Sequence, residues 1–157
     1  MERPAPYSFS PRFEWQHCEV EGLEGFAILV RPTITNRERE VLVAQHGKIV
    51  EYELEWVKLG PERDQEDTPR KREMALLAPY IKEWNAVGLL EDGTEAPLPS
   101  PAEAGPDAFL AIDAAAYDWI VQHLLLGYRA SGKAGSWDGK SRRTRGTSPA
   151  GNGGDQS

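Results

Sequence analysis

The sequence predicts an α+β fold, mostly helical, in which a small N-terminal β-hairpin packs on a helical body and a disordered C-terminal tail follows. Before residue 31, apolar and polar residues alternate and glycines interrupt the alternation, as in two strands joined by a turn. Helix-start signals then appear at Thr35 and at Thr68, each ahead of apolar residues at helical spacing. From Gly132 onward the chain is rich in glycine and almost free of apolar residues, so it cannot repay the entropy of ordering.

These signals divide the 157 residues into three parts. Residues 1–12 carry three prolines and are expected to form a flexible, extended arm. Residues 13–131 are long enough to form a single domain around one core. Residues 132–157 are expected to be a disordered, Gly-rich basic tail, because they hold five Lys or Arg against two Asp, a charge of +3. The rest of the chain holds 13 basic against 23 acidic residues, a charge of −10.

The hairpin is expected at the start of the domain. FEWQHCEV, which begins at Phe13, alternates apolar and polar residues as a half-buried strand does. FAILVR is a β-rich apolar run that ends before Pro32, and EGLEG between the two runs supplies the glycines of a turn.

The first helix is expected to begin at a capping box. The Thr35 hydroxyl can accept from the Glu38 amide while the Glu38 carboxylate reaches back. Its extent has two interpretations, because residues 50–57 (VEYELEWV) alternate as an edge strand would. We favour a helix, with Gly47 as a weak point or a break, because Glu and Leu are good helix formers. Apolar residues also recur at heptad-like spacing, at Leu42, Ile49, Trp56 and Leu59.

The second helix is expected after a polar, acidic loop. Thr68 can cap it, and Pro69 suits the first helical position, where a missing N–H costs nothing. The helix is expected to reach Trp84 with a kink at Pro79, which lacks the N–H of a helical hydrogen bond. Asp92-Gly93 then predicts a turn. One apolar face is formed by Met74, Leu77, Ile81 and Trp84.

The C-terminal part of the domain contains a short helix and a longer one. Ser100 and Glu103 form a second capping box, and Gly105-Pro106 ends that helix after about one turn. A final helix is expected to be capped by Asp113, with apolar residues on nearly all sides. Such a helix is either deeply buried or half-covered by a partner.

Four side chains are candidates for binding a partner protein. Trp119, Leu126 and Tyr128 lie off the main apolar stripe of the final helix, and Trp84 ends the middle helix. Large aromatic residues of this kind serve either as core anchors or, when exposed, as binding hot spots. The sequence alone leaves both interpretations open.

Catalysis, metal binding and cofactor binding are not expected. His17 and Cys18 are adjacent, so on a strand they point to opposite faces and cannot act together. His46 and His123 have no Cys, His or carboxylate at metal-ligand spacing. The sequence contains no nucleophile elbow, phosphate loop or dinucleotide fingerprint. We therefore expect a protein that is not an enzyme.

Composition also bounds the compartment and the partners. No apolar run approaches the 18 or so residues of a membrane span, so no membrane association is expected. The lone cysteine argues against a secreted disulfide scaffold and favours a reducing compartment, with cytoplasm as the default. An acidic body repels phosphates, which makes nucleic acid an unlikely partner.

The order of these segments resembles the tail assembly chaperones of long-tailed bacteriophages. The resemblance covers residues 13–128 and is carried by VRPTITNRE, LLAPYIKEWN and LEDGTEAPLPSPAEAGPDAF, followed by an amphipathic helix. It implies a non-enzymatic protein of the bacterial host cytoplasm. Such a protein binds the tape-measure protein and keeps it soluble while the tail tube assembles, with the tail tube protein as a further candidate partner.

Two other classes of protein remain open. One is a structural phage component, such as a minor tail protein or a head–tail connector, which would stay in the virion. The other is a small nucleic-acid-associated regulator that acts through the basic residues between Lys140 and Arg145, whose binding would fall steeply with salt.

Overall fold

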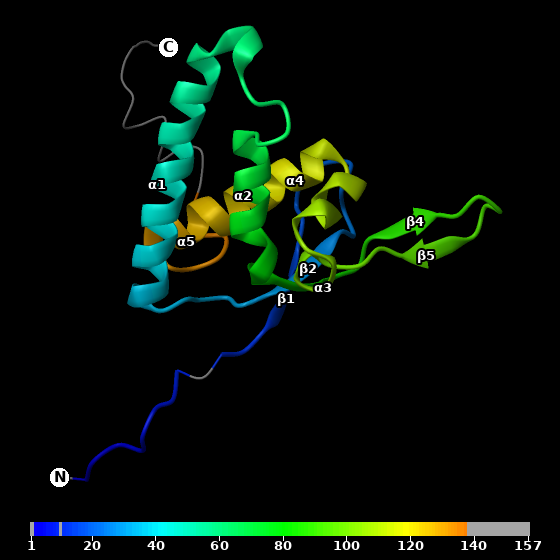
Figure 1. Ribbon diagram of the computed structural model, residues 1–157. Coiled ribbons are helices and arrows are strands. Elements are labelled where there is room, and N and C mark those ends of the chain that lie inside the picture. The colour runs from blue at the N-terminus through cyan, green and yellow to red at the C-terminus, as the bar shows by residue number, and fades with distance from the viewer. Residues whose placement is uncertain (1, 10, 138–157) are drawn as a thin grey trace, which may run out of the picture.

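The computed structural model describes residues 2–9 and 11–137 (Figure 1). Its architecture is α+β and mostly helical, with an N-terminal hairpin, so the predicted fold class is confirmed. A three-stranded sheet in the order β1-β2-β3 and the helices enclose one core, and β4 and β5 form a separate two-stranded sheet. The strands are β1 (Glu14–His17), β2 (Ala27–Val30), β3 (Ile81–Trp84), β4 (Val87–Leu89) and β5 (Glu95–Pro97). The helices are α1 (Asn36–Lys58), α2 (Pro69–Leu77), α3 (Pro101–Ala104), α4 (Ala114–Ile120) and α5 (Gly127–Ser131).

The predicted N-terminal hairpin is confirmed, and its second strand is the centre of the sheet. β1 and β2 pair antiparallel around the glycine-containing turn, and β3 pairs with the other side of β2. Ile28 and Val30 of β2 are fully buried, as expected for a central strand covered by helices. Residues 2–9, 11 and 12 form neither helix nor strand and are exposed, consistent with the arm predicted there.

Helix α1 begins at the predicted capping box. The Glu38 amide donates to Thr35 Oγ1 at 3.2 Å, and the Thr35 amide donates to Glu38 Oε1 at 2.9 Å. The helix then runs unbroken through Gly47 to Lys58, so the helical interpretation of residues 50–57 is confirmed and the suggested break is absent from this described segment. Figure 1 shows α1 and α2 side by side.

The acidic loop between α1 and α2 is held against α1 by two aromatic side chains. Trp56 Nε1 donates to the Asp64 carbonyl at 2.7 Å, and the Arg63 guanidinium lies 4.2 Å from the centre of the Trp56 ring. One turn earlier, Tyr52 donates to the Asp67 carbonyl, and the guanidinium of Arg72 lies over the Tyr52 ring. Both aromatic residues of α1 are therefore used within the molecule.

The prediction of one kinked helix from Pro69 to Trp84 is wrong. Helix α2 ends at Leu77, a 3₁₀ turn (Ala78–Tyr80) follows, and Ile81 opens β3. Pro79 cannot supply the amide that would continue the helix. The next residues instead satisfy their backbone groups on the free edge of β2, which no local sequence signal reports.

The Trp-Asn pair at the end of β3 joins three segments. Trp84 Nε1 donates to the Leu98 carbonyl at 2.9 Å while its ring lies in the core. The Asn85 side chain accepts from the Ala27 amide at 2.8 Å and donates to the Gly25 carbonyl at 2.7 Å. This pair thus ties β3 both to the N-terminal hairpin and to the segment that follows β5.

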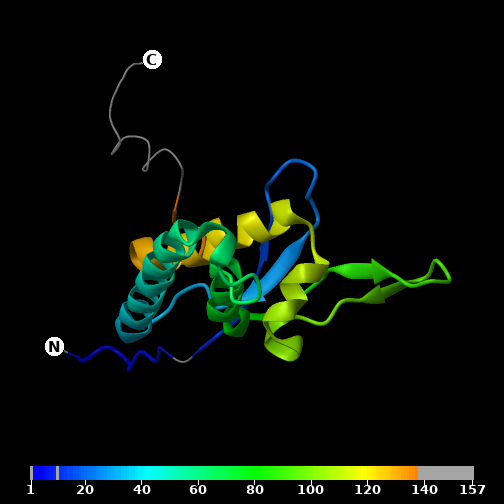
Figure 2. The same ribbon diagram turned by 45° about the horizontal axis from the view of Figure 1, so that its top comes forward.

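The predicted Asp92-Gly93 turn is confirmed, but it is the tip of a hairpin and not a corner before the last helix. β4 and β5 pair antiparallel on either side of it, and Gly93 has φ 85°, which glycine adopts without a steric penalty. Asp92 Oδ1 accepts from the Thr94 amide at 2.9 Å. Both views show this hairpin projecting from the body (Figures 1 and 2).

Residues 114–131, called the last helix below, run from α4 through a π-helical segment (Val121–Leu126) into α5. The helix begins after Asp113, but the Asp113 side chain makes no capping hydrogen bond, so that cap prediction is wrong. The short helix α3 also begins at its predicted cap, where Ser100 Oγ accepts from the Glu103 amide at 3.3 Å. Buried side chains of the last helix include Tyr117, Ile120, Leu124, Leu125 and Tyr128.

The predicted tail boundary at residue 132 is wrong, because residues 132–137 belong to the folded body. The Ile34 amide donates to the Gly132 carbonyl at 2.9 Å, and the Ala134 amide donates to the Pro32 carbonyl at 2.9 Å. The Gly135 amide reaches the last helix, donating to the His123 carbonyl at 2.7 Å. The remainder of the predicted tail, including Lys140 to Arg145, lies outside the described residues.

Candidate partner-binding surface

Two of the four candidate residues lie in the core. Tyr128 is fully buried, its ring centre is 5.3 Å from that of Tyr80, and its hydroxyl donates to the Arg31 carbonyl. Trp84 is 8% exposed, and its indole N–H is used by Leu98. Neither residue presents a surface to a partner, so the partner-binding prediction is wrong for both. From the sequence, the apolar side chains of the last helix could be covered either by the rest of the domain or by a partner. In the structure, the sheet and the other helices cover them.

The other two candidates are partly buried in the same region. Trp119 stacks on His123 with ring centres 4.7 Å apart, and its edge meets Phe26 at 6.0 Å. Phe26 also lies 6.2 Å from Trp84, so these aromatic residues form one intramolecular cluster. Leu126 is half-buried in the π-helical segment. Most of the apolar surface of the last helix is therefore packed within its own domain.

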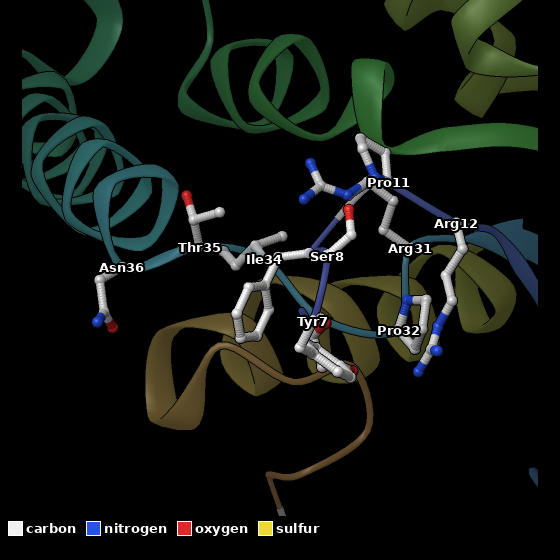
Figure 3. A pocket seen from close by; sticks show the side chains of 11 residues that line it. Tyr7, Ser8, Pro11, Arg12, Arg31, Pro32, Ile34, Thr35 and Asn36 are labelled. Carbon is white, nitrogen blue, oxygen red and sulfur yellow. The ribbon is translucent and has the colours of Figure 1, made fainter. Parts of the chain in front are cut away.

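A cavity of about 420 Å³ lies between the N-terminal arm and the segment that enters α1 (Figure 3). Tyr7 and Arg12 of the arm form one side, and Pro32 and Thr35 lie on the other. Arg31, also in the lining, is engaged by Glu38, whose carboxylate oxygens lie 2.5 Å and 3.0 Å from its guanidinium nitrogens. These hydrogen bonds lower the pKa of Glu38 to about 2.

The Arg31–Glu38 contact at this cavity therefore has a structural role. It connects the end of β2 to the first turn of α1, and the same carboxylate completes the capping box. Its cation is already paired, so the geometry around Arg31 does not require an added anion. We assign no ligand to this cavity.

Three half-buried titratable groups, Glu73, His46 and His123, have partners inside the body. The Tyr117 hydroxyl donates to Glu73 Oε1 at 2.7 Å, and burial raises the pKa of Glu73. His46 Nδ1 lies 2.6 Å from an Arg129 guanidinium nitrogen, and burial, together with that charge, lowers the pKa of His46. His123 contacts Gln16 Oε1, and burial lowers its pKa as well. These contacts connect elements that are distant in sequence and are accounted for by packing.

Two further properties concern metals and membranes. Within residues 2–9 and 11–137, no three His, Cys, Asp or Glu side chains gather in a way that could hold a metal ion. In the same part of the chain, no helix has the combination of length and apolar character that crossing a bilayer requires. The described surface does carry a line of exposed apolar side chains on α1.

Helix α1 presents a line of apolar side chains to solvent. Val50, Leu54 and Val57 are 43%, 60% and 57% exposed, and Val43 is half-buried on the same line. These four residues are called the α1 stripe. Gly47 lies between Val43 and Val50, so the line advances in alternating steps of four and three residues, the spacing of a helix seam. The stripe is about 21 Å long at 1.5 Å per residue.

The sequence contained this stripe, but sequence reasoning did not identify it as a surface. The alternation of residues 50–57 places Val50 and Leu54 on one side of a candidate strand, and the helical interpretation rests on Leu42, Ile49, Trp56 and Leu59. Of these, Leu42 is fully buried, Ile49 and Trp56 are half-buried, and Leu59 is exposed. Both seams have helical spacing, so periodicity could not tell which one the fold would cover.

The surroundings of the α1 stripe suit a helix better than a small molecule. Glu40, Glu51 and Lys58 flank it and are exposed. At its N-terminal end an open hollow is lined by Asn36, Arg39, Glu40, Val43 and Ala44.

A second exposed apolar group lies on the projecting hairpin, at Val87, Leu89 and Leu90.

An exposed apolar seam with charged flanks can dock the apolar face of another helix, a common mode of peptide recognition. It offers no nucleophile, acid–base pair or cofactor cradle, so its chemistry is that of association. Comparisons of this chain with protein-family models, with curated proteins and with solved structures found no match.

Proposed function

We propose that this chain is a tail assembly chaperone of a phage or prophage, which binds helical segments of the tape-measure protein. The observation that supports the proposal best is the α1 stripe, an apolar helix seam left in solvent on an otherwise acidic body. The resemblance of VRPTITNRE, LLAPYIKEWN and LEDGTEAPLPSP to that family points to the same activity.

The proposed mechanism is reversible covering of apolar helix surface. A tape-measure protein is a long helical chain whose apolar seams are exposed until the tail tube encloses them. The α1 stripe would cover one such seam, while the acidic surface of the chaperone keeps the complex apart from other complexes by charge repulsion. The proposed place of action is the host cytoplasm, where the tail tube protein is a candidate second partner.

The first test is co-expression with tape-measure fragments encoded by the same genome. We expect the fragment to become soluble and to co-purify with the wild-type chain. Leu54→Asp should abolish co-purification, because it puts a charge at the most exposed residue of the α1 stripe. Val41→Asp is the matched control: Val41 is 51% exposed on the same helix but lies off the stripe, so this variant should still bind.

The outcome also separates the alternatives. Purified virions should lack the protein if it is a chaperone, whereas a minor tail or connector protein would remain in them. Binding of the chain to nucleic acid with a steep salt dependence, and to no tape-measure fragment, would favour the regulator. Equal fragment binding by wild type and Leu54→Asp would remove the α1 stripe from the proposal.

A further inference from the structure

Gly47 lies in the middle of α1, and no contact within the described part of the chain explains why this residue is a glycine. Glycine in a helix interior costs about 1 kcal/mol relative to alanine. A Cβ atom added at Gly47 would have no heavy atom within 4 Å, so nothing in the described chain requires glycine there. A glycine on an exposed helix seam allows the backbone of a neighbouring helix to approach closely.

The hollow at the start of the α1 stripe has the form of a socket for a helix side chain. Four of its lining residues, Asn36, Arg39, Glu40 and Val43, are spaced at i, i+3, i+4 and i+7. Four residues with this spacing make the hole that receives one side chain of a facing helix in knobs-into-holes packing. The most exposed side chains of the stripe, those of Leu54 and Val57, lie at its opposite end.

The charged side chains beside the α1 stripe are complementary to those of a second copy of α1 that runs in the opposite direction. Along the helix they run Glu40, Glu51 and Lys58, and all three are exposed. Turning a second copy end for end places Glu40 against Lys58 of that copy. A parallel arrangement would instead place Glu51 of one copy at the same level as Glu51 of the second copy. This pair of like charges is unfavourable.

From these observations we infer that, in the free protein, a second copy of this chain docks on the α1 stripe with its own α1 antiparallel. The two-fold axis passes near residues 48 and 49. Leu54 then faces Val43 of the second copy, Gly47 faces Val50, and Val57 enters the hollow. The interface is isologous: each copy uses the same stripe, which contributes both the side chains that insert and the hollow that receives them.

This inference does not require the proposed function, because it concerns the protein alone. The two are compatible if a tape-measure helix displaces the second copy from the same stripe. The exposed Lys58–Glu55 pair, at 3.3 Å, is weak enough for Lys58 to change its partner to Glu40 of the second copy.

Sedimentation equilibrium of the full chain tests the association. We expect a concentration-dependent dimer for wild type, and at least about tenfold weaker dimerisation for Leu54→Asp. Val41→Asp adds the same charge on the same helix, off the stripe, and should dimerise as wild type does. Circular dichroism checks that the variants are folded. A wild-type chain that stays monomeric, or equal dimerisation of both variants, would overturn the inference.

Cysteine cross-linking tests the orientation independently. In a Cys18→Ala background, the double variant Val43→Cys/Leu54→Cys should form a disulfide-linked dimer rapidly on oxidation. The two positions are about 16 Å apart along one helix, too far for an internal disulfide. Each single variant should cross-link slowly in an antiparallel pair. Rapid cross-linking of the single variants would instead show parallel helices and contradict the proposed arrangement.

Discussion

The two longest helical segments, α1 and the last helix, use their apolar residues in opposite ways. The last helix directs Ile120, Leu124 and Leu125 into the core, each fully buried. Helix α1 has 23 residues, but Leu42 is its one side chain in the buried class. A helix can therefore be ordered as part of a domain while most of its apolar side chains remain in contact with solvent.

Polar contacts explain how α1 stays attached with so little buried apolar surface. Its first turn is bound to β2 through Glu38 and Arg31, and Arg39 donates to the Arg129 and Ala130 carbonyls at 2.9 Å and 3.0 Å. Its second half is attached through the loop that Tyr52 and Trp56 hold. Because polar contacts fix the helix, its apolar seam can remain exposed to solvent.

The largest expected effect is on the packing side of this comparison. Leu124→Ala should lower the free energy of unfolding by about 2–5 kcal/mol, because it leaves a cavity in a fully buried part of the last helix. Urea denaturation measures the change. A loss below about 1 kcal/mol would show that the last helix does not depend on core packing as described.

Residues 132–137 give a second test, because they cover the last helix. Gly135 has φ 79°, and a Cβ atom there would lie 2.8 Å from His123 Cε1. Gly135→Ala should therefore destabilise the protein by about 1–3 kcal/mol in thermal or urea unfolding. Gly93→Ala, at φ 85° but with no atom near the added Cβ, controls for the backbone strain alone and should cost less.

The polar attachment of α1 should be sensitive to acid. The pKa of Glu38 is lowered from 4.5 to about 2, so its contribution to stability is present above pH 4.5 and is lost as the pH falls toward 2. The side chain is 37% exposed, and solvent screening reduces the contribution to about 1 kcal/mol. Glu38→Gln should be less stable than wild type at pH 7 by that amount, and the difference should disappear near pH 2.

A matched variant separates this contact from the general loss of negative charge. Glu40→Gln removes a carboxylate two residues away that is exposed. Its unfolding free energy at pH 7 should stay close to that of wild type. An equal loss in both variants would mean that the Arg31–Glu38 contact does not stabilise α1.

The smallest expected effect is on the exposed seam. Leu54→Ala should change the unfolding free energy of the monomer by less than about 0.5 kcal/mol, because the side chain is 60% exposed. The measurement belongs at low protein concentration, where association does not contribute. A loss of 2 kcal/mol or more, as in core truncations, would mean that Leu54 packs within its own chain.

Some elements could be predicted because their causes are local in sequence. The capping box at Thr35 and Glu38 joins residues three apart, and the Asp92-Gly93 turn depends on two adjacent residues. The hairpin was recognisable from two β-rich runs joined by glycines. These local signals were sufficient for the fold class and for the start of each main helix.

The candidate site was harder to predict because exposure is not local. Trp84 and Tyr128 have the size and aromatic character of binding hot spots, and they have the same character when they fill a core. Val50 and Leu54 gave no stronger signal than Leu42 and Ile49, which share their helix and its period. The choice between them depends on where the other elements pack.

By itself, then, the sequence determined the α+β class, the N-terminal hairpin, the starts of the helices and the turn, since each follows from residues close together in the chain. Only the tertiary structure decided that residues after Pro79 pair with β2, that residues 132–137 cover the last helix, and which side of α1 faces solvent. These outcomes depend on the free edge of a strand and on apolar surface supplied by distant segments. Local propensity contains no record of either.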